Sequence, residues 1–126
     1  MSFHLWGSEG TTEHGHNYYE IFLVTDGRVC HEINGKISEI SKGTLCMICP
    51  GDIHQLRRIE NFSSIHMNIC LSPKKFEEIC SALGIDSKEF ESQKPLTAAL
   101  STEEQAYFSS RASLINKLIG DGYEKA

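Results

Sequence analysis

The sequence contains no long apolar run. Its longest apolar stretches of a few residues fall far short of the roughly 20 residues that a transmembrane helix needs. The first ten residues contain no lysine or arginine and no apolar core of the kind found in a signal peptide. We therefore expect neither a membrane partner nor secretion.

Positive charge is also scarce. Lysine and arginine number 12 against 17 aspartates and glutamates, which gives a net charge of −5 and an isoelectric point near 5.6. Proteins that grip nucleic acid need a basic face to meet the phosphates. We therefore expect that this chain does not itself bind DNA.

The chain has five cysteines, an odd number with no secretory context, which predicts a reduced, cytoplasmic protein. Cys46 and Cys49 in "CMIC" have a spacing seen in zinc sites. On a strand, however, residues three apart point to opposite faces. We expect both to be small apolar strand residues.

Length and composition predict one globular domain, with 126 residues that are 40% hydrophobic and 23% charged. Turn-forming pairs punctuate short β-forming stretches at regular intervals. They are Asp26-Gly27, Asn34-Gly35, Lys42-Gly43, Gly51-Asp52 and Glu60-Asn61. Asn-Gly and Asp-Gly favour tight hairpins because both positions need a positive φ. The pattern predicts about seven strands in an antiparallel sandwich or barrel.

Two helices are predicted after residue 71. Ser72 is placed to cap the first and Gly84 to end it, while Ser101 and Glu104 form a capping box for a second helix that ends at Gly120. Pro95 lies in the linker between them. The apolar positions are Phe76, Ile79, Cys80 and Leu83 in the first helix, and Tyr107, Phe108, Ala112, Leu114, Ile115, Leu118 and Ile119 in the second.

The broad apolar stripe of the second helix predicts contacts on two sides. We expect one side to pack on the barrel and the other to form a two-fold dimer through residues 104–119. The alternative is that the whole stripe packs on the outer wall of the sheet and on Phe76 and Leu83.

The stretch "EHGHNYYEIFLVTDG" carries the main candidate site. Alternate residues of a strand share a face, so His14, His16, Tyr18 and Glu20 should project together. Six extended residues span roughly 20 Å, so Glu20 can join the histidines around one ion only if the chain bends after His16. His54, beyond the Pro-Gly-Asp turn, would be a fourth ligand.

The same residues could instead line a polar pocket without metal. Tyr18, Glu20, His54, Arg58 and His66 offer an aromatic face with donors and acceptors for a ligand. The histidines and Glu20 could also be purely structural. His4 and His31 are expected at the surface.

Two motifs carry a family resemblance. The first has His14, His16, Glu20 and Gly27, and the second has Pro50, Gly51 and His54 in "GTLCMICPGDIH". Together they resemble the cupin family. The glycine directly after the proline, with Arg58 where the enzymes usually have asparagine, is similar to the sugar-sensing N-terminal domain of AraC-type transcription regulators. "HGHNYYEIFLVTDGRVCHEINGK" is particularly similar to the chitobiose-operon type.

This resemblance implies a mostly β fold, an antiparallel, jelly-roll-like cupin β-barrel over residues 1–71, followed by a C-terminal helical hairpin over residues 72–126 within one domain. It also implies a sensor for a small-molecule effector, expected to be a sugar, that acts as a homodimer and reaches DNA only through a domain absent from this chain. A divalent transition metal, namely Zn, Ni, Mn or Fe, is the expected cofactor, held by His14, His16, Glu20 and His54. The alternative functions are a stand-alone metal-dependent cupin enzyme, such as a dioxygenase or isomerase, and a structural module with an inert pocket.

Overall fold

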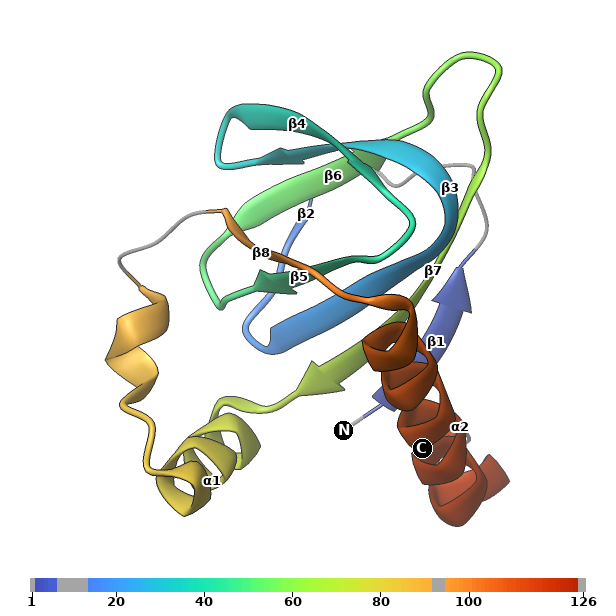
Figure 1. Cartoon of the computed structure of the whole chain (residues 1–126). Helices are drawn as coiled ribbons and strands as arrows, with labels where there is room; N and C mark the ends of the chain where they lie inside the picture. The colour runs from blue at the N-terminus through green and yellow to red at the C-terminus, as the bar shows by residue number, and fades with distance from the viewer. Residues whose placement is uncertain (1, 7–13, 92–94, 125–126) are drawn as a thin grey trace.

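A computed structural model describes the backbone of residues 2–6, 14–91 and 95–124, and the side chains within 15–91, 95–114 and at 117. Eight strands and two α-helices follow one another in these ranges (Figure 1). They are β1 (Ser2–Trp6), β2 (His14–Gly15), β3 (Tyr19–Ile33), β4 (Lys36–Ser41), β5 (Thr44–Ile48), β6 (Ile53–Arg57), β7 (Ser64–Leu71), α1 (Pro73–Leu83), the 3-10 helix η1 (Ser87–Phe90), β8 (Leu96–Ala99) and α2 (Thr102–Glu124). The predicted mostly β fold with two C-terminal helices is confirmed.

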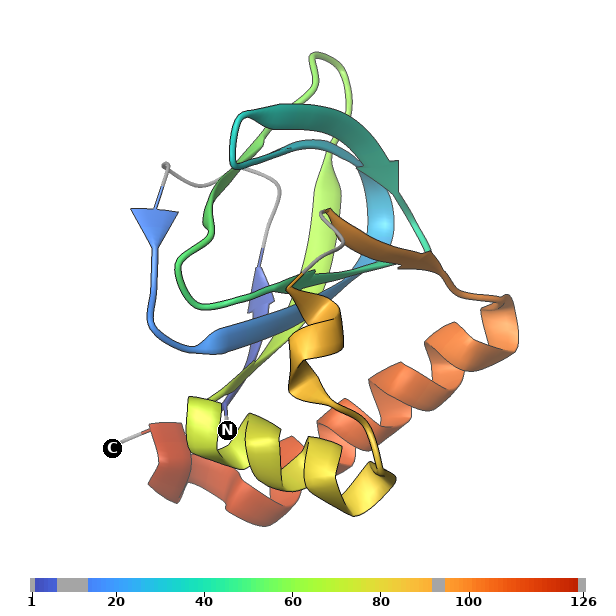
Figure 2. The same cartoon turned by 90° about the vertical axis from the view of Figure 1, so that its left-hand side faces the viewer.

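The strands form an antiparallel half-barrel around the long strand β3. The first part of β3 pairs with β7 and β5, which continue to β1 and β8 at the two ends. The second part of β3 pairs with β4 and β6, and β6 pairs with β2. Figures 1 and 2 both place α1 and α2 at one end of the molecule, outside the curved sheet.

The turn pairs behave in two different ways. Asn34 and Gly35 join β3 to β4 with φ values of 49° and 84°, as predicted for a tight hairpin. The prediction of a hairpin at Asp26-Gly27 was wrong, because β3 runs straight through this pair. Here the register with β7 shifts by one residue between Val24 and Asp26, which is a β-bulge. Gly27, at φ 76°, bends the strand from one part of the sheet into the other.

Apolar side chains pack on both faces of the sheet. The inner cluster contains Phe22, Val24, Val29, Ile33, Ile40, Cys46, Ile48 and Leu56. On the outer face, α2 covers one cluster around Leu23 and Met67, and α1 covers another around Leu71. All five cysteines are free thiols, and Cys46 and Cys49 are buried. Cys46 is an apolar strand residue as expected, whereas Cys49 follows the end of β5.

The helix ends follow the predicted chemistry. The Ser72 side chain accepts a hydrogen bond from the backbone of Lys75, and Gly84 closes α1 at φ 70°. Ser101 and Glu104 form the reciprocal capping box at the start of α2. No helix within the described ranges is long and apolar enough to span a bilayer.

Three details differ from expectation. Only Phe76 and Cys80 of the predicted α1 face are buried, whereas Ile79 and Leu83 are exposed, because α1 touches the sheet with a narrow edge. The linker around Pro95 contains β8, which pairs with β5, so the two helices are not joined by a short loop. Helix α2 also runs past Gly120 to Glu124.

We predict that Gly27→Ala destabilises the fold strongly. A Cβ at Gly27 would lie 1.7 Å from the backbone oxygen of Ser63, so β3 and the loop before β7 would have to separate. We expect a loss of roughly 3 kcal/mol or more in the free energy of unfolding, measured by urea denaturation.

Gly35→Ala is the matched control for this substitution. Gly35 also has a positive φ, but a Cβ there meets nothing within 4 Å. Its cost should therefore be only the left-handed backbone strain, about 1–2 kcal/mol. Equal losses in the two variants would contradict the proposed role of the close approach at Ser63.

Candidate functional site

Three strands and one bend bring the candidate site together inside the half-barrel. Glu20 projects inward from β3, His54 from β6, and Asn68 from β7, and all three are buried. Residues 16–18 leave the strand conformation between β2 and β3, which is the bend that the sequence required for His16 to approach Glu20. His16 lies half-buried at this bend.

The Glu20 carboxylate is the centre of the cluster. Its Oε1 lies 3.2 Å from His16 Nε2 and 3.4 Å from His54 Nε2. Its Oε2 accepts a hydrogen bond of 2.6 Å from the Asn68 side-chain amide. One buried carboxylate is therefore shared among three side chains from separate segments.

The hydrogen bonds of His16 determine where its proton lies. Its Nδ1 is 2.7 Å from the Tyr18 carbonyl oxygen, which can only accept, so Nδ1 carries a hydrogen and donates it. In a neutral imidazole, Nε2 then presents a lone pair to the Glu20 oxygen, another acceptor. This contact is favourable only if Nε2 is protonated or a cation lies between the two atoms.

His31 is a site residue that the sequence analysis placed wrongly at the surface. It is only 1% exposed, and its Nε2 lies 3.4 Å from His54 Nδ1. Its ring meets Phe22 edge-on, at 5.4 Å between centroids. The cause is the bulge in β3, since even-numbered residues face inward before it and odd-numbered residues after it, including His31. The alternation of Val29, His31 and Ile33 was the signal that could have revealed this.

His66 and Asn68, two residues apart on β7, face the same interior. His66 is 5% exposed and lies 5.4 Å from Phe22 between ring centroids. Buried atoms without a hydrogen-bond partner within the described part of the chain include His31 Nδ1, His66 Nδ1 and Asn68 Oδ1. Native proteins rarely leave such atoms unpaired, so they are natural contacts for water or a ligand.

The remaining predicted residues lie at the edge of the cluster or away from it. Tyr18 is half-buried and stacks on the His16 ring at 4.0 Å. Arg58 is exposed, and its Nε donates to the Phe62 carbonyl, so the structure does not bring it to the cluster. His14 pairs with His54 across β2 and β6, but its side chain lies outside the described residues.

Asp52 fixes the turn that precedes His54. Its carboxylate accepts from the Cys49 backbone at 2.8 Å and from the Asn34 side chain at 3.0 Å. The Asn34 oxygen in turn accepts from the Ile53 backbone at 2.9 Å. These bonds tie the β5–β6 turn to the β3–β4 hairpin and hold the start of β6 in place.

The surroundings of the buried groups keep Glu20 negatively charged and keep His31 and His66 neutral. Burial raises the pKa of Glu20, but the hydrogen bonds from His54 and Asn68 and the nearby imidazoles outweigh it and lower that pKa from 4.5 to about 2. Burial lowers the pKa of His31 from 6.5 to about 4, and it also lowers the pKa of His66. At neutral pH, both of these histidines therefore offer one donor and one acceptor each.

The donor set also fits a transition metal. One ligand atom each from His16, Glu20 and His54 lie within 4.8 Å of one another. Two ligands about 2.1 Å from a tetrahedral ion lie about 3.4 Å apart, which is close to the 3.2 and 3.4 Å between Glu20 Oε1 and the two imidazole nitrogens. The hydrogen bond from His16 Nδ1 to a backbone carbonyl is the usual support for a metal-bound imidazole.

Comparisons with known sequences agree on one family. Residues 4–115 match the AraC-like ligand binding domain. The chain is 28% identical over 83 residues to the HTH-type transcriptional activator RhaS of Escherichia coli O139:H28, a match that covers 66% of this chain and 30% of that protein. It is 34% identical over 64 residues to RhaS of Escherichia fergusonii, covering 51% and 23%. The matches thus span less than a third of these curated relatives.

Solved structures show the same fold. Apo ToxT K231A from Vibrio cholerae superposes with a TM-score of 0.63 at 11% identity, covering 90% of this chain and 48% of that one. A cupin protein from Bacteroides fragilis superposes with a TM-score of 0.54 at 18% identity, covering 56% and 64%. At these identities the likeness concerns the fold alone.

We predict that Glu20 makes the stability of the protein depend on acid pH. Its folded pKa is lowered, so its contribution is present in full above pH 4.5 and is lost as the pH falls toward 2. The shift corresponds to about 3 kcal/mol. Urea denaturation between pH 7 and pH 3 should show that Glu20→Gln removes this part of the pH dependence. Glu39→Gln, at an exposed ion pair with Arg28, should retain it. An unchanged pH profile in Glu20→Gln would contradict the assignment.

Proposed function

Because this chain belongs to the AraC-like ligand binding domain family, we propose that it is the effector-sensing part of an AraC-type transcription regulator. The observation that supports this most is the buried polar interior, with unpaired atoms on His31, His66 and Asn68. The curated relatives are HTH-type transcriptional activators. DNA binding would then reside in a domain outside this chain, and the effector would act by binding two arrangements of the regulator with different affinity.

A sugar is the effector class that the interior suits best, in line with the similarity to the chitobiose-operon type. A hydroxyl group both donates and accepts, and neutral His31 and His66 together with Asn68 offer both roles. The Glu20 carboxylate could accept from a hydroxyl or an amino group, and the aromatic ring of Tyr18 stands beside it. A neutral or amino sugar would satisfy these atoms without bringing a second negative charge next to Glu20.

A calorimetric screen of mono- and disaccharides tests this proposal. We expect one sugar to bind and to raise the melting temperature through linkage. His66→Leu should weaken that binding at least tenfold, because it removes a buried partner. Arg58→Ala, at an exposed position outside the cluster, should not. Binding of anionic keto acids or of hydrophobic compounds alone would refute a sugar effector.

We further propose that His16, Glu20 and His54 hold a divalent transition metal, with His14 as an added ligand from β2. Zn, Ni, Mn and Fe all accept imidazole and carboxylate ligands. When bound, such an ion would supply Lewis acidity and an anchor for ligand oxygens. The chain's own residues would orient the site: Tyr18 holds His16 through its carbonyl, and His31 contacts the far nitrogen of His54.

The same donor set supports a second candidate function, a stand-alone metal-dependent cupin enzyme such as a dioxygenase or isomerase. Two histidines and a carboxylate suit non-haem iron. The gene sequence beyond codon 126 separates the two functions. A reading frame that continues into a basic helix-turn-helix domain supports the regulator, whereas a stop codon favours the enzyme.

Elemental analysis of protein purified with added metal tests the ion itself. We expect close to one transition ion per chain, lost in His16→Ala and retained in His66→Ala, since His66 is outside the ligand set. Protein without metal after supplementation, together with a His16→Ala variant of unchanged thermal stability, would refute the metal site.

We also propose a two-fold dimer through α2. Phe108 and Ala112 pack on the outer cluster of the sheet, so this side of the helix is already covered. Tyr107 is 63% exposed and Leu114 is 47% exposed, and they lie on the opposite side together with Arg111, which stacks over Tyr107. Ile115, Leu118 and Ile119, also part of the expected face, lie outside the described side chains. An exposed apolar stripe of this kind suits a second copy of the same helix.

Sedimentation at micromolar concentration tests the dimer. We expect wild-type protein to sediment as a dimer and Leu114→Glu to sediment as a monomer, because a charge would be placed in the contact. Ser113→Glu, at an exposed flanking position, should leave the dimer intact. A monomeric wild type would contradict the proposal.

A further inference from the structure

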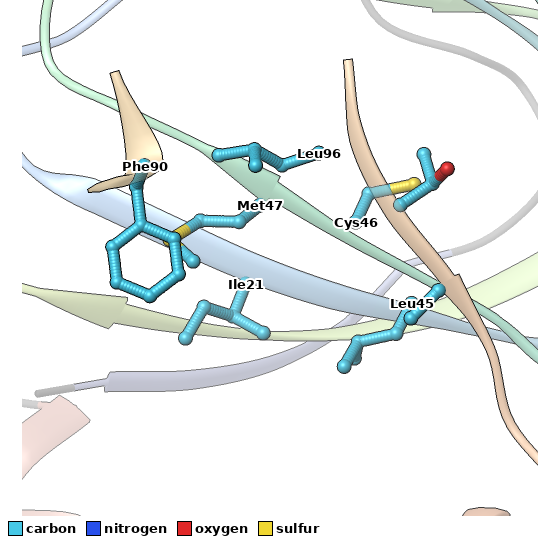
Figure 3. Close-up of a pocket in the computed structure, with 8 residues that line it drawn as sticks. Ile21, Leu45, Cys46, Met47, Phe90 and Leu96 are labelled. Carbon is cyan, nitrogen blue, oxygen red and sulfur yellow. The ribbon is translucent and has the colours of Figure 1, made fainter. Parts of the chain in front are cut away.

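The two helices leave an apolar gap on the outer face of the sheet. Helix α1 packs near Ile21 and Met47, whereas α2 packs near Leu45. Between these two covers lies a pocket of about 210 Å³ (Figure 3). It is lined by Ile21, Leu45, Cys46, Met47, Phe90, Leu96, Thr97 and Ala98.

This pocket is chemically unlike the interior site. No lining side chain carries a charge, and the polar groups among the lining residues are the Thr97 hydroxyl and the Cys46 thiol. The Cys46 side chain belongs to the inner cluster, so it contributes little to the outer surface of the pocket. A charged ligand would lose its hydration there without gaining a partner. Apolar surface, by contrast, gains roughly 25 cal/mol for each Å² removed from water.

The size of the pocket suits a small molecule. A dry apolar cavity of roughly 150 Å³ is enough to bind benzene in a protein interior. The pocket here has a similar volume but is partly open, so one aromatic ring or a short alkyl chain would occupy it with part of its surface still in water. A full sugar disaccharide would find neither the space nor the hydrogen-bonding groups.

The surroundings of the pocket do not suit a docked protein. On β8 its rim consists of the small exposed residues Thr97 and Ala98, and on η1 Phe90 has charged neighbours in the sequence. None of the lining residues is among the large exposed apolar side chains of the described surface. A protein partner would need a wider apolar patch around the anchor point. The apolar surface that could stabilise a bound molecule therefore lies inside the pocket and not around it.

We propose that this outer pocket is a second ligand site, which binds a small uncharged apolar molecule independently of the polar interior. Ile21 lies between Glu20 and Phe22 in β3, so the two sites occupy opposite faces of one strand. The proposal does not depend on the effector proposed above, because the interior would bind a polar molecule and the outer pocket an apolar one.

Titration with benzene, followed by NMR of isotope-labelled methyl groups, tests the site. We expect saturable binding with contacts from benzene protons to the Ile21 and Met47 methyls. Benzoate, which has the same ring with a charge, should bind at least tenfold more weakly. Contacts to inner-face residues instead, or no saturable binding of benzene, would overturn the proposal.

Two matched variants sharpen the result. Ala98→Phe should fill the pocket from β8 and weaken benzene binding at least tenfold. Ala99→Phe introduces the same ring at the next, exposed residue, which does not line the pocket, and should bind as wild type does. Equal benzene affinity in wild type and a folded Ala98→Phe would also overturn the proposal. If Ala98→Phe does not fold, the methyl contacts in wild type still decide.

Discussion

A one-residue register shift in β3 decides which side chains reach the interior. Before the shift, Glu20, Phe22 and Val24 face inward, and after it Val29, His31 and Ile33 do so. The shift is possible because Gly27 passes close to the backbone of Ser63, where no side chain would fit. Without it, the second half of β3 would turn its charged and polar residues inward, and His31 would face solvent. Both the inner core and the polar cluster therefore depend on the same bend.

In the polar cluster, neighbouring side chains compensate the buried charge of Glu20. A carboxylate buried inside an apolar barrel is stable only if other groups neutralise it, and Glu20 has two imidazoles and one amide within reach. The hydrogen bond from His16 to the Tyr18 carbonyl then leaves a nitrogen lone pair opposite the carboxylate. Such a contact calls for a positive charge, either a proton or a metal ion. His31 and His66, which lie farther from the carboxylate, are neutral. The interior therefore has a charged part around Glu20 and an uncharged polar part around these two histidines.

Local signals in the sequence predicted the parts of the structure that depend on local chemistry. The caps at Ser72 and Ser101 and the Asn34-Gly35 hairpin follow from rules that act within a few residues. The grouping of His16, Glu20 and His54 followed from motif spacing and the need for a bend. The alternation of Val29, His31 and Ile33 was the one local signal for the inward position of His31. That position does not follow from such short-range rules, because it depends on a bulge held by the backbone of Ser63, far along the chain. The same applies to β8, a strand only because β5 offers an unpaired edge, and to Arg58, which lies just past the end of β6.

The topology also sets the order in which the protein can be completed during synthesis. Glu20 emerges from the ribosome early, yet its amide partner Asn68 lies 48 residues later. At about 5–20 residues per second, this interval lasts roughly 2 to 10 s. During that time the first part of β3 has neither β7 on one side nor, at first, β5 on the other, and its acidic side chain remains in water. The nascent chain can therefore form the β3–β4 hairpin before it can form the polar cluster. A pause in translation before β7 would prolong the time during which β3 has an unpaired edge.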